Sequence, residues 1–204
     1  MSLPNRITLL RFLLAIVLFV LLSQLEPPNR IPYFEDLHSH PSEFSWVLNV
    51  AWVFFLLVAL TDALDGYLAR RLDLSTDFGR IADPFVDKIY ICGTFVFLSS
   101  AQDLAVRIDA WMVVLVIGRE FLITGIRGYT EARGHSFPAS LWGKLKMFLQ
   151  CATVVAILLT TANFPTTPFF LWTTRLILWS MLAVTFFSAV LYCRAASRLT
   201  SFST

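Results

Sequence analysis

Long apolar segments separated by short polar connections dominate the sequence. Each segment approaches the roughly 20 residues that an α-helix needs to cross the hydrocarbon core of a bilayer. Apart from Arg119 and Glu120, almost no charged residue stands in the middle of a segment. The pattern therefore predicts an all-α integral membrane protein, a single domain over residues 1–204 with six transmembrane helices. The expected spans are 7–23, 45–66, 81–100, 108–130, 141–162 and 168–192.

The composition points to the same class of protein. Hydrophobic residues make up 57% of the chain and charged residues only 15%, and the mean hydropathy is +0.69. The 19 phenylalanines and six tryptophans also exceed the usage of soluble proteins. A chain of this length leaves little room for a second domain outside the bilayer.

The distribution of lysine and arginine predicts the orientation in the membrane. In the expected topology most of them fall on one side of the bilayer, and by the positive-inside rule that side is cytoplasmic. Both termini should then face the cytoplasm, as an even number of spans requires. A basic face also suits anionic lipid headgroups, and we expect no nucleic-acid partner. The basic residues on this side are Arg6, Arg11, Arg70, Arg71, Arg80, Lys88, Arg119, Arg127, Arg133, Lys144, Lys146, Arg194 and Arg198; the other side keeps Arg30, Arg107 and Arg175.

Four aspartates stand around the end of the second span and the start of the third. Asp62 and Asp65 are three residues apart, and Asp83 and Asp87 are four apart, so each pair shares one face of a helix. Ionised carboxylates in an apolar segment are unfavourable unless they are compensated. Divalent cations, with Mg²⁺ or Mn²⁺ favoured by hard oxygen ligands, compensate them best. The spacing predicts a site for two divalent cations at the cytoplasmic end of the bundle.

A two-metal site can neutralise charge on both the attacking and the leaving oxygen of a phosphoryl-type displacement. One carboxylate must also accept the proton of the attacking alcohol. Asp87, in the last turn of the motif, is the candidate for this catalytic role, and the other three aspartates act mainly as metal ligands. Gly66 and Ala69 keep the ligand face bare, which would admit a nucleotide or, alternatively, a closely packed helix.

The complete pattern, D-x2-D-G-x2-A-R-x8-G-x3-D-x3-D, resembles the signature of the CDP-alcohol phosphotransferases. The resemblance implies that Gly66, Ala69, Arg70 and Gly79 belong to the surface that receives the cytidine diphosphate part of the donor. It also implies a homodimer. A structural alternative is that the acids are ion-pair partners of neighbouring basic residues. The signature positions are Asp62, Asp65, Gly66, Ala69, Arg70, Gly79, Asp83 and Asp87.

The amino end reads LPNRITLLRF over residues 3–12. Taken alone, it signifies only a helix start with a basic anchor. The stretch nevertheless resembles the amino end of the bacterial phosphatidylglycerophosphate synthases within this family. The resemblance implies that Asn5 and Thr8 contribute to binding of the donor, CDP-diacylglycerol.

Two later segments place four cations near, but outside, the aspartate motif. GREFLITGIR, residues 118–127, contains Arg119 and Arg127, and SLWGKLKMFLQ, residues 140–150, contains Lys144 and Lys146. An arginine inside a span usually faces a polar cavity. Together these side chains could hold a phosphate that does not react, such as that of glycerol 3-phosphate. Positive-inside anchoring is the alternative explanation.

The leading hypothesis is an enzyme of the bacterial cytoplasmic membrane whose active site faces the cytoplasm. It would transfer the phosphatidyl group of CDP-diacylglycerol to glycerol 3-phosphate, which gives phosphatidylglycerol phosphate and CMP. The same chemistry with inositol phosphate, phosphatidylglycerol or serine as acceptor is one alternative. A divalent-cation transporter or a noncatalytic membrane scaffold is another, because acids in spans also mark ion paths.

Overall fold

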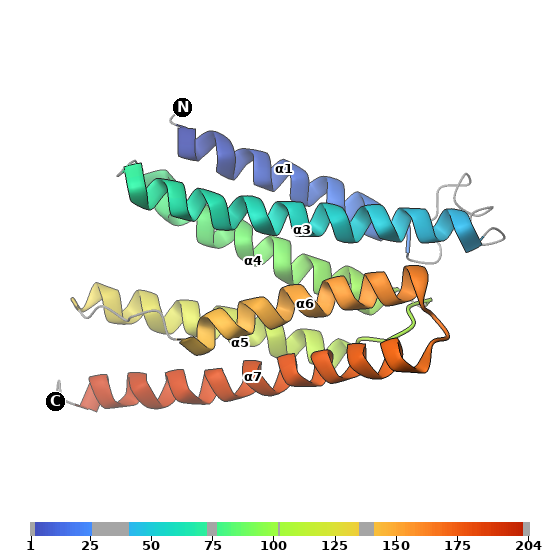
Figure 1. The fold of residues 1–204 in the computed structure, drawn as a ribbon. Helices are drawn as coiled ribbons and strands as arrows, with labels where there is room; N and C mark the ends of the chain where they lie inside the picture. Colours follow the sequence, from blue (N-terminus) through green and yellow to red (C-terminus); the bar gives the residue numbers. More distant parts are fainter. Residues whose placement is uncertain (1–2, 26–40, 73–76, 102, 135–140, 202–204) are drawn as a thin grey trace.

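The computed structural model describes the backbone of residues 3–25, 41–72, 77–101, 103–134 and 141–201, and the side chains of 8–25, 45–61, 82, 84–101, 103–134 and 141–197. Six helices form this part of the chain (Figure 1). Each coincides with one expected span, so the six-helix expectation is confirmed. The helices are α1 (Leu3–Ser23), α3 (Pro41–Leu72), α4 (Asp77–Ser100), α5 (Ala110–Ala132), α6 (Leu141–Asn163) and α7 (Pro168–Ser201).

Several helices are longer than the apolar segments that predicted them. Helix α3 continues to Leu72, α4 begins at Asp77, and α7 continues to Ser201. Hydropathy marks only the part of a helix that sits among apolar surroundings. Its polar ends, which are rich in arginine and other good helix formers, continue the backbone hydrogen bonds without contributing to that signal.

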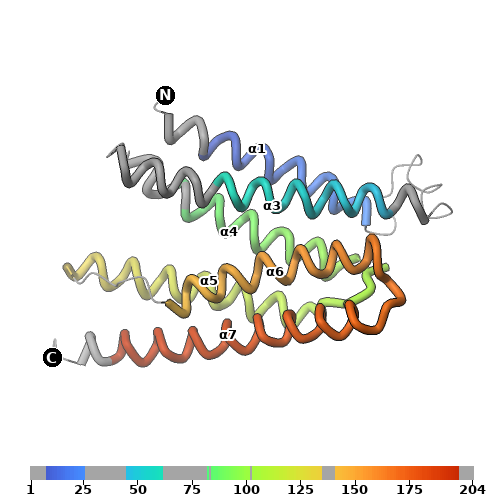
Figure 2. The backbone as a smooth tube through the Cα atoms, in the orientation of Figure 1, coloured from blue at the N-terminus to red at the C-terminus, as the bar shows by residue number. Residues whose placement is uncertain are grey.

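The helices lie roughly side by side and alternate in direction (Figures 1 and 2). Helix α1 packs on α3 and α4, and α6 contacts α3 and α4 on one side and α7 on the other. Helix α5 packs on α4 and α7. As a result, the start of α1 and the end of α7 lie at the same end of the bundle (Figure 1).

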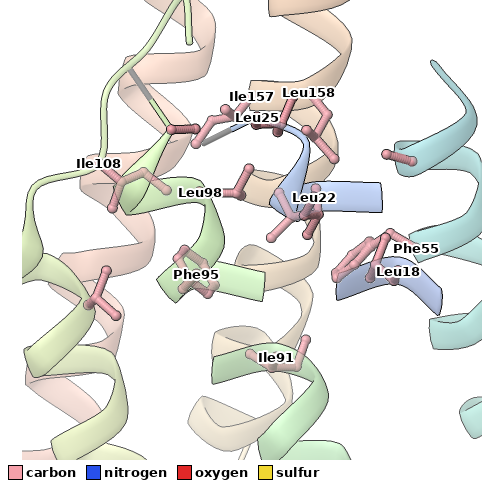
Figure 3. Close-up of a cluster of buried hydrophobic side chains, with 14 of the residues drawn as sticks. Leu18, Leu22, Leu25, Phe55, Ile91, Phe95, Leu98, Ile108, Ile157 and Leu158 are labelled. Atoms are coloured by element: carbon pink, nitrogen blue, oxygen red, sulfur yellow. The ribbon is translucent and has the colours of Figure 1, made fainter. Parts of the chain in front are cut away.

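The interior toward the opposite end is apolar, and we call this region the apolar half. Its side chains come from all six helices and are almost completely inaccessible. Burial of such side chains is the main favourable term for packing these helices together where water would otherwise reach them. The cluster includes Leu18, Leu22, Phe55, Phe95, Leu98, Ile157 and Leu158 (Figure 3).

Two contacts fix the positions of α1 and α3 relative to α4. The ring of Tyr90 on α4 stacks on Phe55 of α3 with centroids 4.9 Å apart, and its hydroxyl donates a hydrogen bond to the Phe55 carbonyl oxygen. Gly93 on α4 faces the ring of Phe19 on α1, and a Cβ at Gly93 would clash with the Phe19 Cζ. The glycine thus permits the close approach of α1 to α4.

The outer surface of the bundle is strongly apolar. Large side chains such as Val114, Phe121, Phe148, Trp172 and Leu176 are exposed on it. So large an apolar surface is typical of contact with another apolar phase. Among the described residues, two helices are long and apolar enough to cross a membrane: α6, and α7 over Pro168–Ser197. Shorter apolar stretches occupy Thr8–Ser23 and Ser45–Thr61. The protein is therefore an all-helical chain with the character of a membrane protein.

Candidate active site

The four signature aspartates belong to two helices. Asp62 and Asp65 lie in the last turns of α3, whereas Asp83 and Asp87 lie in the first half of α4. Of the four, only Asp87 has a described side chain. The expected metal positions of the other three, and the expected donor-binding positions of Asn5, Gly66, Ala69, Arg70 and Gly79, lie outside the described side chains. Thr8, the remaining donor-binding candidate, is buried on α1.

The Asp87 carboxylate forms an ion pair with Arg11 of α1. Arg11 Nη1 donates a hydrogen bond to Asp87 Oδ1 over 2.8 Å. The arginine side chain is 5% exposed, whereas that of the aspartate is 37% exposed. A buried guanidinium beside a partly accessible carboxylate compensates its charge while leaving it open to the interior of the bundle.

A cavity opens beside Asp87 between α4, α5 and α6. Its narrow lobe, of about 260 Å³, is lined by Asp87, Lys88, Glu120, Arg127, Lys146 and Gln150 together with Pro84, Ile91 and Met147. Its wide lobe, of about 650 Å³, shares six of these residues and extends toward Arg119, Lys144, Glu131 and Tyr192. The combined space is in the range of small-molecule sites, roughly 300–1,000 Å³.

All four cations expected to hold the acceptor phosphate line the wide lobe: Arg119, Arg127, Lys144 and Lys146. The structure thus brings together residues from two helices that the sequence could only place on one side of the membrane. Lys88 adds a fifth positive charge, against the carboxylates of Glu120 and Glu131. The excess of positive charge favours an anion within the cavity.

Contacts with Glu120 divide the four predicted cations into two groups. Its Oε1 accepts a hydrogen bond from Lys146 Nζ and lies 3.6 Å from Arg119 Nη1. Arg119 is held further by a 3.1 Å hydrogen bond from its Nε to Ser188 Oγ, and it lies over the Tyr192 ring. Both cations are therefore positioned by protein groups before any ligand enters.

The second group is less constrained. Lys144 is exposed, and Arg127 is half-buried. The Arg127 Nε is shielded from water and has no hydrogen-bond partner among the described residues. A buried guanidinium N–H without a partner is rare in proteins and is unfavourable until an acceptor arrives. Arg127 is therefore the cation in this cavity best prepared to bind an anion.

Several site residues had no assigned role in the sequence analysis. Arg11 stood only as a basic anchor, and Lys88 only as a charge on the basic side. Glu120 was noted without a function, and Gln150 was part of an apolar run. The helical spacing gave one usable signal, because Gln150 follows Lys146 by four residues and therefore shares its face.

The described side chains contain no group of three histidine, cysteine or acidic residues that could hold a metal ion. That set leaves out three of the four signature aspartates. Asp87, the fourth, presents an oxygen ligand at the cavity wall. Its donor chemistry fits a hard divalent cation.

Comparison with known proteins identifies the family to which the chain belongs. Residues 1–191 match the family described as CDP-alcohol phosphatidyltransferase. The chain belongs to the CDP-alcohol phosphatidyltransferase family. The resemblance inferred from the aspartate motif is thereby confirmed over nearly the whole chain.

Relatives within the CDP-alcohol phosphatidyltransferase family carry more specific names. The chain is 35% identical over 159 residues to a CDP-diacylglycerol–glycerol-3-phosphate 3-phosphatidyltransferase of Bacillus subtilis, covering 78% of this chain and 77% of that protein. It is 32% identical over 202 residues to a protein of the same name from Pseudomonas fluorescens, covering 96% and 90%. A probable phosphatidylglycerophosphate synthase of Mycobacterium tuberculosis is 39% identical over 105 residues, about half of each chain.

Proposed function

We propose that this chain transfers the phosphatidyl group of CDP-diacylglycerol to glycerol 3-phosphate, and that the products are phosphatidylglycerol phosphate and CMP. Family membership and the names of the relatives support the reaction class and both substrates. The cavity is the observation that supports glycerol 3-phosphate as the acceptor. It places the Asp87 carboxylate and a surplus of cations around one space of suitable size.

The cations bind the phosphate of the acceptor, which does not react. Arg127 offers an N–H without a partner among the described residues, and Lys144 and Lys146 add charge from α6. An unphosphorylated acceptor such as serine would leave this positive charge uncompensated. The phosphorylated alcohol is held with its hydroxyl group toward Asp87, because Asp87 lines the narrow lobe and the cations gather in the adjoining wide lobe.

The Asp87 carboxylate accepts the proton of the attacking hydroxyl. The hydroxyl oxygen forms a bond to the phosphorus that carries the diacylglycerol. The bond from this phosphorus to the oxygen that bridges it to the cytidine monophosphate breaks, and CMP leaves with that oxygen and both bonding electrons. Arg70, at the end of α3, is proposed to offset negative charge on the donor phosphates.

Asp62, Asp65, Asp83 and Asp87 would hold two divalent cations, Mg²⁺ or Mn²⁺. When bound, such cations polarise a phosphoryl oxygen and neutralise negative charge on the reacting oxygens. The contact of Tyr90 with Phe55 supports this proposal, because it joins α3 to α4 close to Asp87.

The proposed location of the active site follows from the lipid donor and from the distribution of charge. The acyl chains of the donor would remain in the bilayer while its headgroup reaches the aspartate helices. We place the active site on the cytoplasmic side of the bacterial inner membrane, on the strength of the lysine and arginine distribution. A homodimer is proposed from the family resemblance.

An acceptor assay tests the proposal. The purified protein in lipid nanodiscs is given CDP-diacylglycerol, Mg²⁺ and one labelled acceptor: glycerol 3-phosphate, inositol phosphate or serine. CMP release and the lipid product are measured, with and without EDTA. We expect phosphatidylglycerol phosphate from glycerol 3-phosphate and no product in EDTA. A preference for inositol phosphate would overturn the choice of acceptor, and metal uptake into vesicles without CMP release would overturn the enzyme.

The metal proposal has its own variants. Asp62→Asn and Asp65→Asn should raise the Mg²⁺ concentration needed for half-maximal activity. An unchanged metal dependence in both would exclude these two residues as ligands.

A further inference from the structure

Gln150 is the least satisfied polar side chain on the inner face of α6. It is 0% exposed, yet neither its Oε1 nor its Nε2 has a hydrogen-bond partner among the described residues. A buried amide with both ends unpaired is unfavourable, and native proteins keep such groups rare. Gln150 also borders the narrow lobe of the cavity. An amide in this position indicates a partner that the described residues do not provide.

The position of Gln150 along α6 limits what that partner can be. Lys146 lies one turn before it on the same face, about 6 Å away along the helix axis. Asp87, on the neighbouring helix, borders the same narrow lobe. A ligand in this lobe can therefore contact Lys146, Asp87 and the Gln150 amide at the same time.

The hydrogen-bonding capacity of the Gln150 amide favours a hydroxyl group over a phosphate as its partner. A phosphate offers only acceptors, so it would pair with Nε2 and be repelled by Oε1. A hydroxyl group can donate a hydrogen bond to Oε1 or accept one from Nε2, so it can pair with either end of the amide. The phosphate already has charged partners in Arg127 and Lys146, and the terminal hydroxyl must approach Asp87. The hydroxyl on the middle carbon is the group that remains.

We propose that Gln150 is a specificity-determining residue that hydrogen-bonds the middle-carbon hydroxyl of the acceptor. This inference rests on the proposed function, because it takes glycerol 3-phosphate as the acceptor. A site built to hydrogen-bond a hydroxyl rejects an analogue that lacks it, since the buried polar group is then left unpaired. Gln150 thus selects a phosphorylated vicinal diol over a simple phosphorylated alcohol.

The experiment compares two acceptors in two variants. The acceptors are glycerol 3-phosphate and 3-hydroxypropyl phosphate, which keeps the phosphate and the attacking hydroxyl but lacks the middle one. The first variant is Gln150→Met, which keeps the unbranched shape without the amide. The matched control is Thr153→Val on the same helix, whose buried hydroxyl donates to the Leu149 carbonyl oxygen and does not line the cavity. If Gln150→Met does not purify as a folded protein, Gln150→Leu replaces it.

The measured quantity is the ratio of kcat/KM for the two acceptors. Wild type and Thr153→Val should prefer glycerol 3-phosphate by about tenfold or more. Gln150→Met should lower kcat/KM for glycerol 3-phosphate by about the same factor and leave the analogue within about twofold. If the analogue reacts too slowly, its inhibition constant against labelled glycerol 3-phosphate gives the same comparison.

Three results would overturn the inference. The first is an unchanged ratio in Gln150→Met. The second is an equal loss for both acceptors, which would assign Gln150 to the phosphate or to the fold. The third is a ratio that collapses in Thr153→Val as well. A wild-type protein that makes no phosphatidylglycerol phosphate would instead remove the proposed function, and this inference with it. That outcome is recognised without any variant.

Discussion

Helix α6 passes from one kind of interior to another. In the apolar half, its Thr160 hydroxyl meets that of Thr174 on α7 at 2.8 Å, and Thr161 Oγ1 accepts the Ala105 N–H at 3.1 Å. Nearer its start, Gln150 and the neighbouring Arg127 of α5 bury polar atoms without partners among the described residues. We call the region of Arg11, Asp87 and the cavity the polar half. Among the described residues, the buried polar side chains of the first region find partners within the protein, whereas the second region keeps buried polar atoms that we propose a ligand to satisfy.

This contrast separates residues that hold the bundle together from residues that act on substrate. Truncation of a core side chain in the apolar half should alter the free energy of unfolding and leave turnover by the folded protein nearly unaffected. A change at a cavity residue of the polar half should instead lower turnover or substrate affinity, whereas loss of the ion pair between Arg11 and Asp87 should also affect stability. Four predictions use this difference.

The largest effect is expected for Asp87→Asn. The amide keeps the size of the side chain but cannot accept a proton from the acceptor hydroxyl, so kcat should fall by about a thousandfold or more. Donor binding should persist. The measurement is CMP release alongside CDP-diacylglycerol binding in nanodiscs, with Asp109→Asn, an exposed acid before α5, as the matched control. Turnover within tenfold of wild type would exclude Asp87 as the base.

Phe95→Ala should produce the converse effect in the apolar half. Its ring is completely buried in the cluster of α1, α4 and α6, and truncation of such a ring costs about 3–5 kcal/mol of unfolding free energy. The folded fraction should keep a kcat within about twofold of wild type. Phe121→Ala, which removes an exposed ring from α5, is the matched control for denaturant unfolding. A large loss of kcat in folded Phe95→Ala would show that the two halves are coupled.

Arg127→Ala should affect binding of the acceptor alone. Loss of one charge-assisted contact costs roughly 1.5–3 kcal/mol, which raises the KM for glycerol 3-phosphate about ten- to a hundredfold. The KM for CDP-diacylglycerol should stay within twofold. Arg133→Ala removes an exposed charge at the end of the same helix, outside the cavity, and should resemble wild type. If the two variants have equal effects, Arg127 does not bind the acceptor and serves only as a positive charge that sets the membrane orientation.

The smallest effect concerns the ion pair of Arg11 with Asp87. Arg11→Gln leaves the carboxylate less compensated, which should lower Tm in EDTA by about 2–4 °C for each kcal/mol lost. Saturating Mg²⁺ should reduce this difference if a bound cation replaces the lost positive charge. Arg107→Gln, an exposed charge between α4 and α5, should show no such metal dependence. If Arg11→Gln lowers Tm equally with and without Mg²⁺, no bound cation replaces the charge of Arg11 beside Asp87.

The sequence predicted the helices and the grouping of charge well. Apolar segments of membrane length identify helices with little ambiguity, because backbone polar groups in an apolar phase must be satisfied internally. The cations of α5 and α6 were also predicted to act together, and all four line one cavity. Their roles, and those of the aspartates, remain proposals.

The contacts between distant helices could not be predicted in this way. Arg11 and Asp87 are 76 positions apart, and their ion pair depends on how closely α1 packs on α4. The sharing of Glu120 between Arg119 and Lys146 likewise depends on the rotation of α6 against α5. Gln150 gave no signal beyond its helical spacing from Lys146, since a glutamine in an apolar helix also fits a packing role. Its significance appears only when its amide atoms are seen to lack partners.

The contact between Gly93 and Phe19 has a consequence for how the enzyme tolerates mutation. The Phe19 ring also stacks on Phe97, with centroids 5.3 Å apart, and this contact restricts its movement away from a larger residue at position 93. Even a methyl group there would press α1 away from α4, less than two helical turns from Asp87. The distance from Arg11 to Asp87 is therefore set partly by a residue that touches neither. Inactivating substitutions in this family member should therefore include some at the contact of α1 with α4, outside the cavity.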